Sequence, residues 1–341
     1  MWLINSSIGR KFIMALTGIC LVLFVTLHAL MNAVAILWPT AYNQICAMLG
    51  ANWYALVASA GLGLLVVIHI IYAICLTLQN RKARGNDAYK VSKRPAAVEW
   101  SSRNMLVLGF VVLAFLGVHL VQFWAKMQAQ EVCGQWYQCG ETMIPAAAGT
   151  LFIQFAFEQW WTPVLYIIGF VALWFHLSHG FWSMWQSIGW SNTTWLPRLK
   201  CIGNWWVSIV ILIFVAQAVV FTVRANQNFY LTDGALLNQY REMYNERNEE
   251  IVKEASAEIM HARQLDAEGT ADRSEVEGIF MNAQVAAQEE MRVLETSFTN
   301  LMTFAKDRQQ VAPAEAAVIT ETAVEVEEEE VAEVPDTIDN N

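Results

Sequence analysis

The sequence Phe175-His176-Leu177-Ser178-His179-Gly180-Phe181-Trp182 places two imidazoles in a run that is otherwise apolar over most of the thickness of a membrane. An ionisable side chain near the middle of a bilayer-length helix costs ~2.5 kcal/mol or more unless it is paired, solvated or bound to something. Such a residue is therefore a candidate functional residue. Three other apolar segments each carry one histidine near mid-span, at His28, His69 and His119.

Composition divides the 341 residues into two parts. Residues 1–224 carry 13 Lys and Arg against 5 Asp and Glu, whereas residues 225–341 carry 8 against 26. The first part contains five apolar segments of ~20 or more residues, which is the length needed to cross a bilayer. They run roughly over 12–37, 54–78, 104–125, 163–186 and 205–223. This pattern predicts an all-α membrane protein in which residues 1–224 form a five-helix transmembrane bundle, and the acidic balance provides no basic face for nucleic acid.

The distribution of Lys and Arg predicts the orientation of the bundle. Basic residues cluster at 10–11, at 81–103 and at 198–200, whereas the loop over 38–53 has none. The N-terminus is therefore expected on the cytoplasmic side, and five spans place the acidic tail on the outer side.

Counting residues from the cytoplasmic edge of each span predicts two layers of histidines. His28 and His119 form an outer pair, and His69 and His176 form an inner pair, separated by roughly 6 Å of depth. Two layers of two are what bis-imidazole haem ligation requires, whereas a tetrahedral zinc site needs its ligands at one level. The structural alternative is that each histidine only bonds a neighbouring helix. The paired depths favour two haems b.

Glycines give a second pattern. Gly18 and Gly109 lie well inward of the histidines on their own spans, whereas Gly61, Gly63 and Gly169 lie well outward of theirs. Each helix would thus lack a side chain near the level of the haem that it does not ligate. The alternative is ordinary small-residue packing between membrane helices.

Several motifs together resemble a known family. They are Gly-Arg-Lys-Phe-Ile-Met-Ala-Leu-Thr-Gly at 9–18 leading to His28, Ser-Arg-Asn-Met at 102–105 leading to His119, and His176-x-Ser178-x-Gly180-x-Trp182. Residues 1 to about 224 resemble the membrane-anchor cytochrome b of succinate:quinone oxidoreductases (succinate dehydrogenase and fumarate reductase), of the single-polypeptide, five-helix, two-haem type.

The resemblance implies a set of ligands, partners and a location. His28 with His119 would ligate the haem distal to the dehydrogenase, and His69 with His176 the proximal one, with His179 as the competing choice for His176. A flavoprotein subunit and an iron-sulfur subunit would dock on the cytoplasmic face of a bacterial inner membrane. Electrons would pass through the two haems to or from a membrane quinone such as menaquinone, and this chain would do no carbon chemistry itself.

One departure from the family concerns acidic residues. Some members carry a glutamate near the outer start of span two and another just ahead of the ligand in span four, but spans one, two and four here contain no Glu or Asp. Glu141 or Glu158 in the outer loop is a candidate substitute. Two other functions stay open at this stage: a di-haem anchor of another dehydrogenase, of the formate dehydrogenase or hydrogenase type, and a haem-free transporter.

The acidic tail is expected to contain two polar helices. Residues 225–310 are expected to form a helical hairpin with its turn at 266–273. Thr232 or Asp233 is expected to cap the first helix. Residues 311–341, rich in Ala, Val, Pro and Glu, are expected to be disordered. Cys133 and Cys139 in the outer loop could form a disulfide in an oxidising compartment or remain free thiols.

Overall fold

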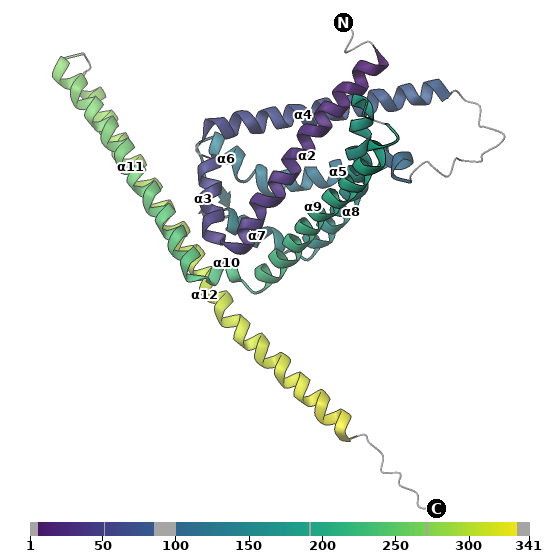
Figure 1. Ribbon diagram of the computed structural model, residues 1–341. Coiled ribbons are helices and arrows are strands. Elements are labelled where there is room, and N and C mark those ends of the chain that lie inside the picture. Colours follow the sequence, from purple (N-terminus) through teal and green to yellow (C-terminus); the bar gives the residue numbers. More distant parts are fainter. Residues whose placement is uncertain (1–5, 51, 85–99, 191, 271, 333–341) are drawn as a thin grey trace, which may run out of the picture. The chain divides into compact units, whose positions relative to one another are not determined.

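The computed structural model describes residues 6–50, 52–84, 100–190, 192–270 and 272–332. It divides into two compact units (Figure 1). The first contains Met1–Tyr137 and Ile144–Asn226, and the second contains Gln138–Met143 and Gln227–Asn341. Each unit is described by itself below.

Five long helices form the first unit. They are α2 (Ser7–Leu37), α4 (Trp53–Arg84), α5 (Trp100–His119), α8 (Trp161–Ile188) and α9 (Trp195–Asn226). Each provides a stretch that is long and apolar enough to cross a membrane, over Ile8–Leu37, Trp53–Ala83, Trp100–Trp124, Trp161–Ile188 and Trp195–Asn226. The five predicted spans are confirmed, and the chain is an all-α multi-pass membrane protein.

The outward faces of these helices are apolar. Leu27, Leu64, Val121 and Leu212 are each more than 60% exposed. In water such a surface would favour aggregation, but lipid chains solvate it without penalty, and the helix satisfies its own backbone groups. The exposure of large apolar side chains is therefore what a membrane location requires.

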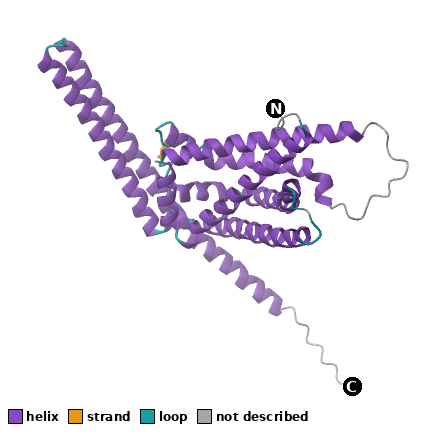
Figure 2. Cartoon of the chain, turned by 45° about the horizontal axis from the view of Figure 1, so that its top comes forward, coloured by secondary structure: helices purple, strands orange, loops and turns teal. Residues whose placement is uncertain are grey.

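The bundle is held together by close contacts between neighbouring helices. Helix α2 packs against α4, α8 and α9, and α8 packs against α5 and α9. Helices α8 and α9 run side by side, as Figure 1 shows. Figure 2 shows that the described chain is almost entirely helical. Gly203 of α9 permits this approach, because a Cβ there would lie 2.3 Å from a ring carbon of Phe181. Small residues at such crossings are typical of membrane helices.

The segments outside the spans contain structure that the sequence did not predict. Helix α3 (Pro39–Gly50) and helix α7 (Gly149–Phe157) are joined by Asn43, whose Oδ1 accepts hydrogen bonds from the backbone N–H and the hydroxyl of Thr150, both at 2.9 Å. A π-helical turn η1 (Leu120–Trp124) ends the third span, and a short α6 (Gln128–Val132) and a hairpin of β1 (Tyr137–Cys139) and β2 (Thr142–Ile144) follow it. Cys133 and Cys139 are exposed free thiols.

The second unit is a helical hairpin. After a short α10 (Phe229–Thr232), helix α11 (Gly234–Glu268) packs along α12 (Arg273–Ala332). Asp233 caps α11 by accepting a hydrogen bond from the Leu236 N–H at 3.0 Å. The chain reverses after Gly269, whose φ of 64° favours glycine.

The interior of the hairpin is a narrow apolar stripe. Buried side chains include Tyr240, Tyr244 and Ile251 on α11 and Leu294 and Leu301 on α12. Helix α12 continues to Ala332, beyond the boundary at residue 310 that composition predicted, and residues 333–341 lie outside the described residues. The division of the tail into a hairpin and a disordered end stays a prediction.

Candidate functional site

The four mid-span histidines lie in two pairs. His28 of α2 faces His119 of α5, with ring centroids 5.7 Å apart and ring planes at 86°. His69 of α4 faces His176 of α8, with ring centroids 6.4 Å apart and planes at 60°. The structure thus brings together the same partners that the depth count paired. Their role as ligands stays a prediction.

The separation within each pair suits a metal held between two imidazoles. With metal–nitrogen bonds of about 2.0 Å on either side, the centroids of two axial imidazole rings lie roughly 6 Å apart. Both pairs are close to this value. Within the described part of the chain, no group of three or more His, Cys, Asp or Glu side chains is arranged to hold a metal ion. Among these residues the four histidines form two separate pairs.

The two pairs are farther apart than the sequence indicated. Thr17 of α2 contacts His69, and Thr17 precedes His28 by 11 residues on the same helix. Eleven residues correspond to about 16 Å of helix, so the predicted separation of roughly 6 Å was wrong. A count from charged residues assumes that they all lie at one depth, whereas long Lys and Arg side chains reach the interface from different levels.

Glycines border one of the two pairs. A Cβ on Gly18 would lie 4.0 Å from Cε1 of His69, and one on Gly109 would lie 3.8 Å from Cε1 of His176. Gly18 lies on α2 and Gly109 on α5, the helices that supply His28 and His119. Each glycine therefore leaves space beside the other pair, His69 and His176, as expected. The same expectation was wrong for Gly169, because the ring of Phe115 already fills the position of its missing side chain, with its nearest atom 2.5 Å from a built Cβ.

A hydroxyl fixes the orientation of His69. The Thr17 hydroxyl donates to the backbone carbonyl of Ile13 at 3.0 Å or Met14 at 3.1 Å. It also lies 3.0 Å from Nδ1 of His69. With its single proton directed to one of its own helix's carbonyls, the hydroxyl is left to accept an Nδ1–H of the ring. The Nε2 lone pair of His69 is then left for another partner.

A longer chain of hydrogen bonds holds His119. Its Nδ1 lies 3.1 Å from the Tyr166 hydroxyl, which donates to Oε1 of Gln122 at 2.9 Å. The Gln122 amide in turn donates to the Thr162 hydroxyl at 3.2 Å. Tyr166, Gln122 and Thr162 are all buried. These residues could not be found from the sequence, because polar groups on different helices show no spacing that links them.

The other two histidines are held differently. Nδ2 of Asn32 donates to Nε2 of His28 at 3.1 Å, and Oδ1 of Asn32 accepts from the Tyr42 hydroxyl at 3.1 Å. A metal at His28 Nε2 would take the lone pair that Asn32 now uses. The Nδ1 atom of His176 is buried and has no hydrogen-bond partner among the described residues. A buried polar atom without a partner is costly, and a bound group or a water is one way to satisfy it.

Aromatic rings surround the pair of His28 and His119. Phe24 stacks on His28 at 5.3 Å, and Phe123 lies 5.4 Å from His119. Phe214 of α9 lies 6.1 Å from His28. Such walls keep the dielectric constant low, which is one of the properties that set the potential of a buried redox group.

The remaining candidate residues belong to neither facing pair, although His179 lies one turn along α8 from His176. His179 contacts the ring of Trp182 at 4.8 Å, and His261 is exposed on α11. Oε2 of Glu158 accepts a hydrogen bond from Gln154 at 3.3 Å, and Glu141 is exposed.

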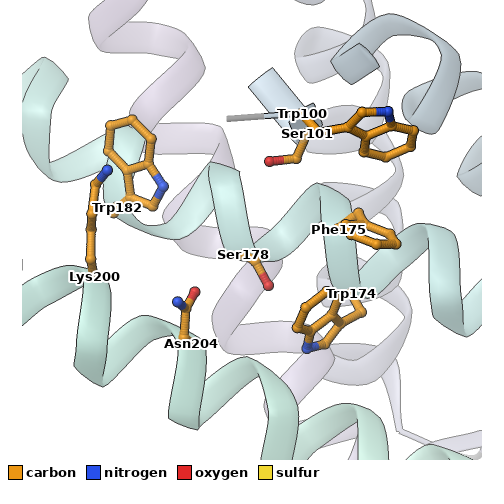
Figure 3. A pocket seen from close by; sticks show the side chains of 8 residues that line it. All are labelled: Trp100, Ser101, Trp174, Phe175, Ser178, Trp182, Lys200 and Asn204. Carbon is orange, nitrogen blue, oxygen red and sulfur yellow. The ribbon is translucent and has the colours of Figure 1, made fainter. Parts of the chain in front are cut away.

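A cavity of about 200 Å³ lies on another face of α8. Figure 3 shows side chains from α5, α8 and α9 around it, and the lining residues are Trp100, Ser101, Trp174, Phe175, Ser178, Trp182, Lys200 and Asn204. The Lys200 ammonium lies 4.0 Å from the centroid of the Trp182 ring. At 100° per residue, the α8 residues in this lining point away from the direction of His176. The cavity is therefore distinct from the space between the paired rings.

These residues fit a haem in three respects. Imidazoles from separate helices face each other at the separation that axial ligation needs. Hydroxyls that accept Nδ1–H leave Nε2 of His69 and His119 for a metal. Glycines border the pair of His69 and His176. No family model, curated protein or solved structure matches this chain, so the site rests on its own geometry.

Proposed function

We propose that this chain is the membrane-anchor cytochrome b subunit of a succinate dehydrogenase or fumarate reductase. It would transfer electrons between an iron-sulfur subunit and a membrane quinone such as menaquinone, with a flavoprotein subunit carrying the carbon chemistry. The observation that supports this most strongly is the arrangement of four intramembrane histidines as two facing pairs, at 5.7 and 6.4 Å, on four different helices.

The residues of the proposed site have separate tasks. His28 with His119 would hold one haem b and His69 with His176 the other, and haem b supplies one-electron redox chemistry when bound. The helices keep the rings facing each other, and the aromatic side chains exclude water. The levels lie about 16 Å apart along α2, so the two sites span much of the ~30 Å hydrocarbon core. This spacing supports a role in carrying electrons across the membrane.

The basic loops support the proposed partners. The loop between α4 and α5 and the starts of α2 and α9 carry most of the Lys and Arg of the first unit. By the positive-inside rule this face is cytoplasmic, and it is where a flavoprotein and an iron-sulfur subunit would dock. The membrane would be the bacterial inner membrane.

Purification of the chain from its native membrane tests the proposal. A mild detergent extract should contain a flavin-bearing subunit and an iron-sulfur subunit, and addition of succinate should reduce the haems. Recovery of formate dehydrogenase or hydrogenase subunits would instead assign the anchor to another complex. Absence of any α-band in reduced-minus-oxidised spectra would refute the cytochrome assignment.

A further inference from the structure

The hydroxyls of Thr17 and Tyr166 stand in the same relation to the two histidine pairs. Each lies about 3 Å from Nδ1 of one ring, His69 for Thr17 and His119 for Tyr166. We propose that Thr17 and Tyr166 are positioning residues, each of which holds one axial imidazole with Nε2 toward the iron and lowers the reduction potential of that haem alone. The inference rests on the proposed function and assigns a role to residues outside the ligand set.

The direction of the hydrogen bonds at Tyr166 determines which nitrogen of His119 carries the proton. A phenol has one proton, and the Tyr166 proton goes to Oε1 of Gln122 at 2.9 Å. The hydroxyl can then only accept from His119 at 3.1 Å, so the ring proton sits on Nδ1. A neutral imidazole protonated on Nδ1 presents its lone pair on Nε2. Tyr166 thus selects the tautomer that can bind iron.

The orientation of Gln122 is itself fixed. Its amide nitrogen donates to the buried Thr162 hydroxyl at 3.2 Å, which leaves the amide oxygen for Tyr166. Gln122 lies in the π-helical turn η1, which directly follows His119 and is closed by a hydrogen bond from the Ala125 N–H to the Leu120 carbonyl at 2.8 Å. Single π turns of this kind occur often at functional sites. The turn buries the Gln122 side chain within reach of α8.

Thr17 holds His69 in the same way, through a shorter series of hydrogen bonds. Its proton goes to a carbonyl of its own helix, so the hydroxyl accepts from His69. Helix α2 therefore carries a ligand for one haem, His28, and the hydroxyl that holds a ligand of the other. Helix α8 does the same with His176 and Tyr166. Each hydroxyl acts on one pair only.

A hydrogen bond from Nδ1–H to an acceptor makes the imidazole a better electron donor to the metal. It stabilises ferric iron more than ferrous iron and lowers the potential. Loss of one such bond should change the ferric-to-ferrous equilibrium about fivefold, the factor that one net hydrogen bond supplies. At 59 mV for a tenfold change in a one-electron couple, this corresponds to about 40 mV.

Potentiometric titration of the purified complex, followed at the haem α-band and by electron paramagnetic resonance, tests the inference. Tyr166→Phe should raise one of the two potentials by about 40 mV, and Thr17→Val should raise the other by a similar amount. Thr17→Ser keeps the hydroxyl and should leave both potentials unchanged. Thr222→Val is the matched control, because the Thr222 hydroxyl donates only to the Ala218 carbonyl of its own helix at 2.7 Å.

Gln122→Met provides a second variant in case Tyr166→Phe does not assemble. It removes the acceptor of the Tyr166 proton, while Nδ1 of the iron-bound ring keeps its own proton and still donates to the hydroxyl. Without the bond to Gln122 the hydroxyl is a weaker acceptor, so the potential of the same haem should rise, by less than in Tyr166→Phe. Two results, each with two haems still bound, would overturn the inference. In one, both potentials stay unchanged in both variants; in the other, the potentials of both haems move together in each variant. A wild-type protein without haem would overturn the proposed function as well.

Discussion

If the proposed haems are present, replacing Gly109 of α5 with leucine should remove one of the two. A Cβ at this position lies 3.8 Å from Cε1 of His176, which is ordinary van der Waals contact. Alanine should therefore be accepted, and Gly109→Ala should keep both haems. The methyl carbons of a leucine lie about 2.5 Å beyond its Cβ. Nonbonded carbon atoms approach the His176 ring only to about 3.5 Å.

The geometry gives the size of the disturbance. A leucine methyl directed at His176 would have to displace the ring by roughly 2 Å, whereas metal–ligand distances tolerate about 0.2 Å. A leucine turned aside would instead fill the space that the glycine leaves open beside His69 and His176. In both cases the haem held by these two residues should be lost, and the haem held by His28 and His119 should remain.

The assay is the haem-to-protein ratio of the purified chain, together with its reduced-minus-oxidised spectrum. Gly117→Leu on the same helix is the matched control, because nothing lies within 4 Å of a Cβ built at Gly117. We expect a ratio of two for the wild type, Gly109→Ala and Gly117→Leu, and a ratio of one for Gly109→Leu. If Gly109→Leu retained two haems with unchanged spectra, the placement of a haem between His69 and His176 would be refuted.

Three further predictions concern ligands, pH and thiols. His176→Ala should lose one haem and His179→Ala should keep both, as measured by haem content; the opposite result would make His179 the ligand. Burial raises the pKa of Tyr244, whose hydroxyl donates to the backbone carbonyl of Met143. In the unfolded chain Tyr244 loses its proton near pH 10, whereas in the folded hairpin it stays protonated to higher pH. The free energy of unfolding of the hairpin should therefore fall as pH rises above about 10. Hydrogen exchange of α11 in the full chain should show this, and Tyr244→Phe should remove that part of the pH dependence; an equal slope in the variant would contradict it. Burial also raises the pKa of the Cys46 thiol to about 12, so a thiolate-directed alkylating reagent at pH 8 should label exposed Cys133 and leave Cys46 unmodified, as peptide mass spectrometry would show.

The spans and the pairing could be predicted from the sequence because both depend on local patterns. Apolar runs of bilayer length identify helices whatever their neighbours are, and a histidine within such a run is conspicuous. Pairing His28 with His119 and His69 with His176 needed only a rank order of depths. The distance between the two pairs depends on how far neighbouring helices are shifted along each other. Residue counts from the loops contain no information on that shift.

The hydrogen-bonded supports of the histidines could not be predicted. Tyr166 and Gln122 are ordinary residues in their own helices, and only the packing of α5 against α8 brings them to His119. Thr17 lies within a segment that the sequence analysis singled out, but its contact with His69 depends on the rotation of α2. The helices α3 and α7 were missed because they are short and lie in loops that carry no strong periodicity.

The haem content and spin state of the purified full-length chain test the central claim most directly. The account predicts two haems b per chain, both low-spin with two axial imidazoles by electron paramagnetic resonance, and loss of one of them in either His28→Ala or His69→Ala. A colourless protein, a single haem per chain, or a high-spin signal with an open axial position would contradict it.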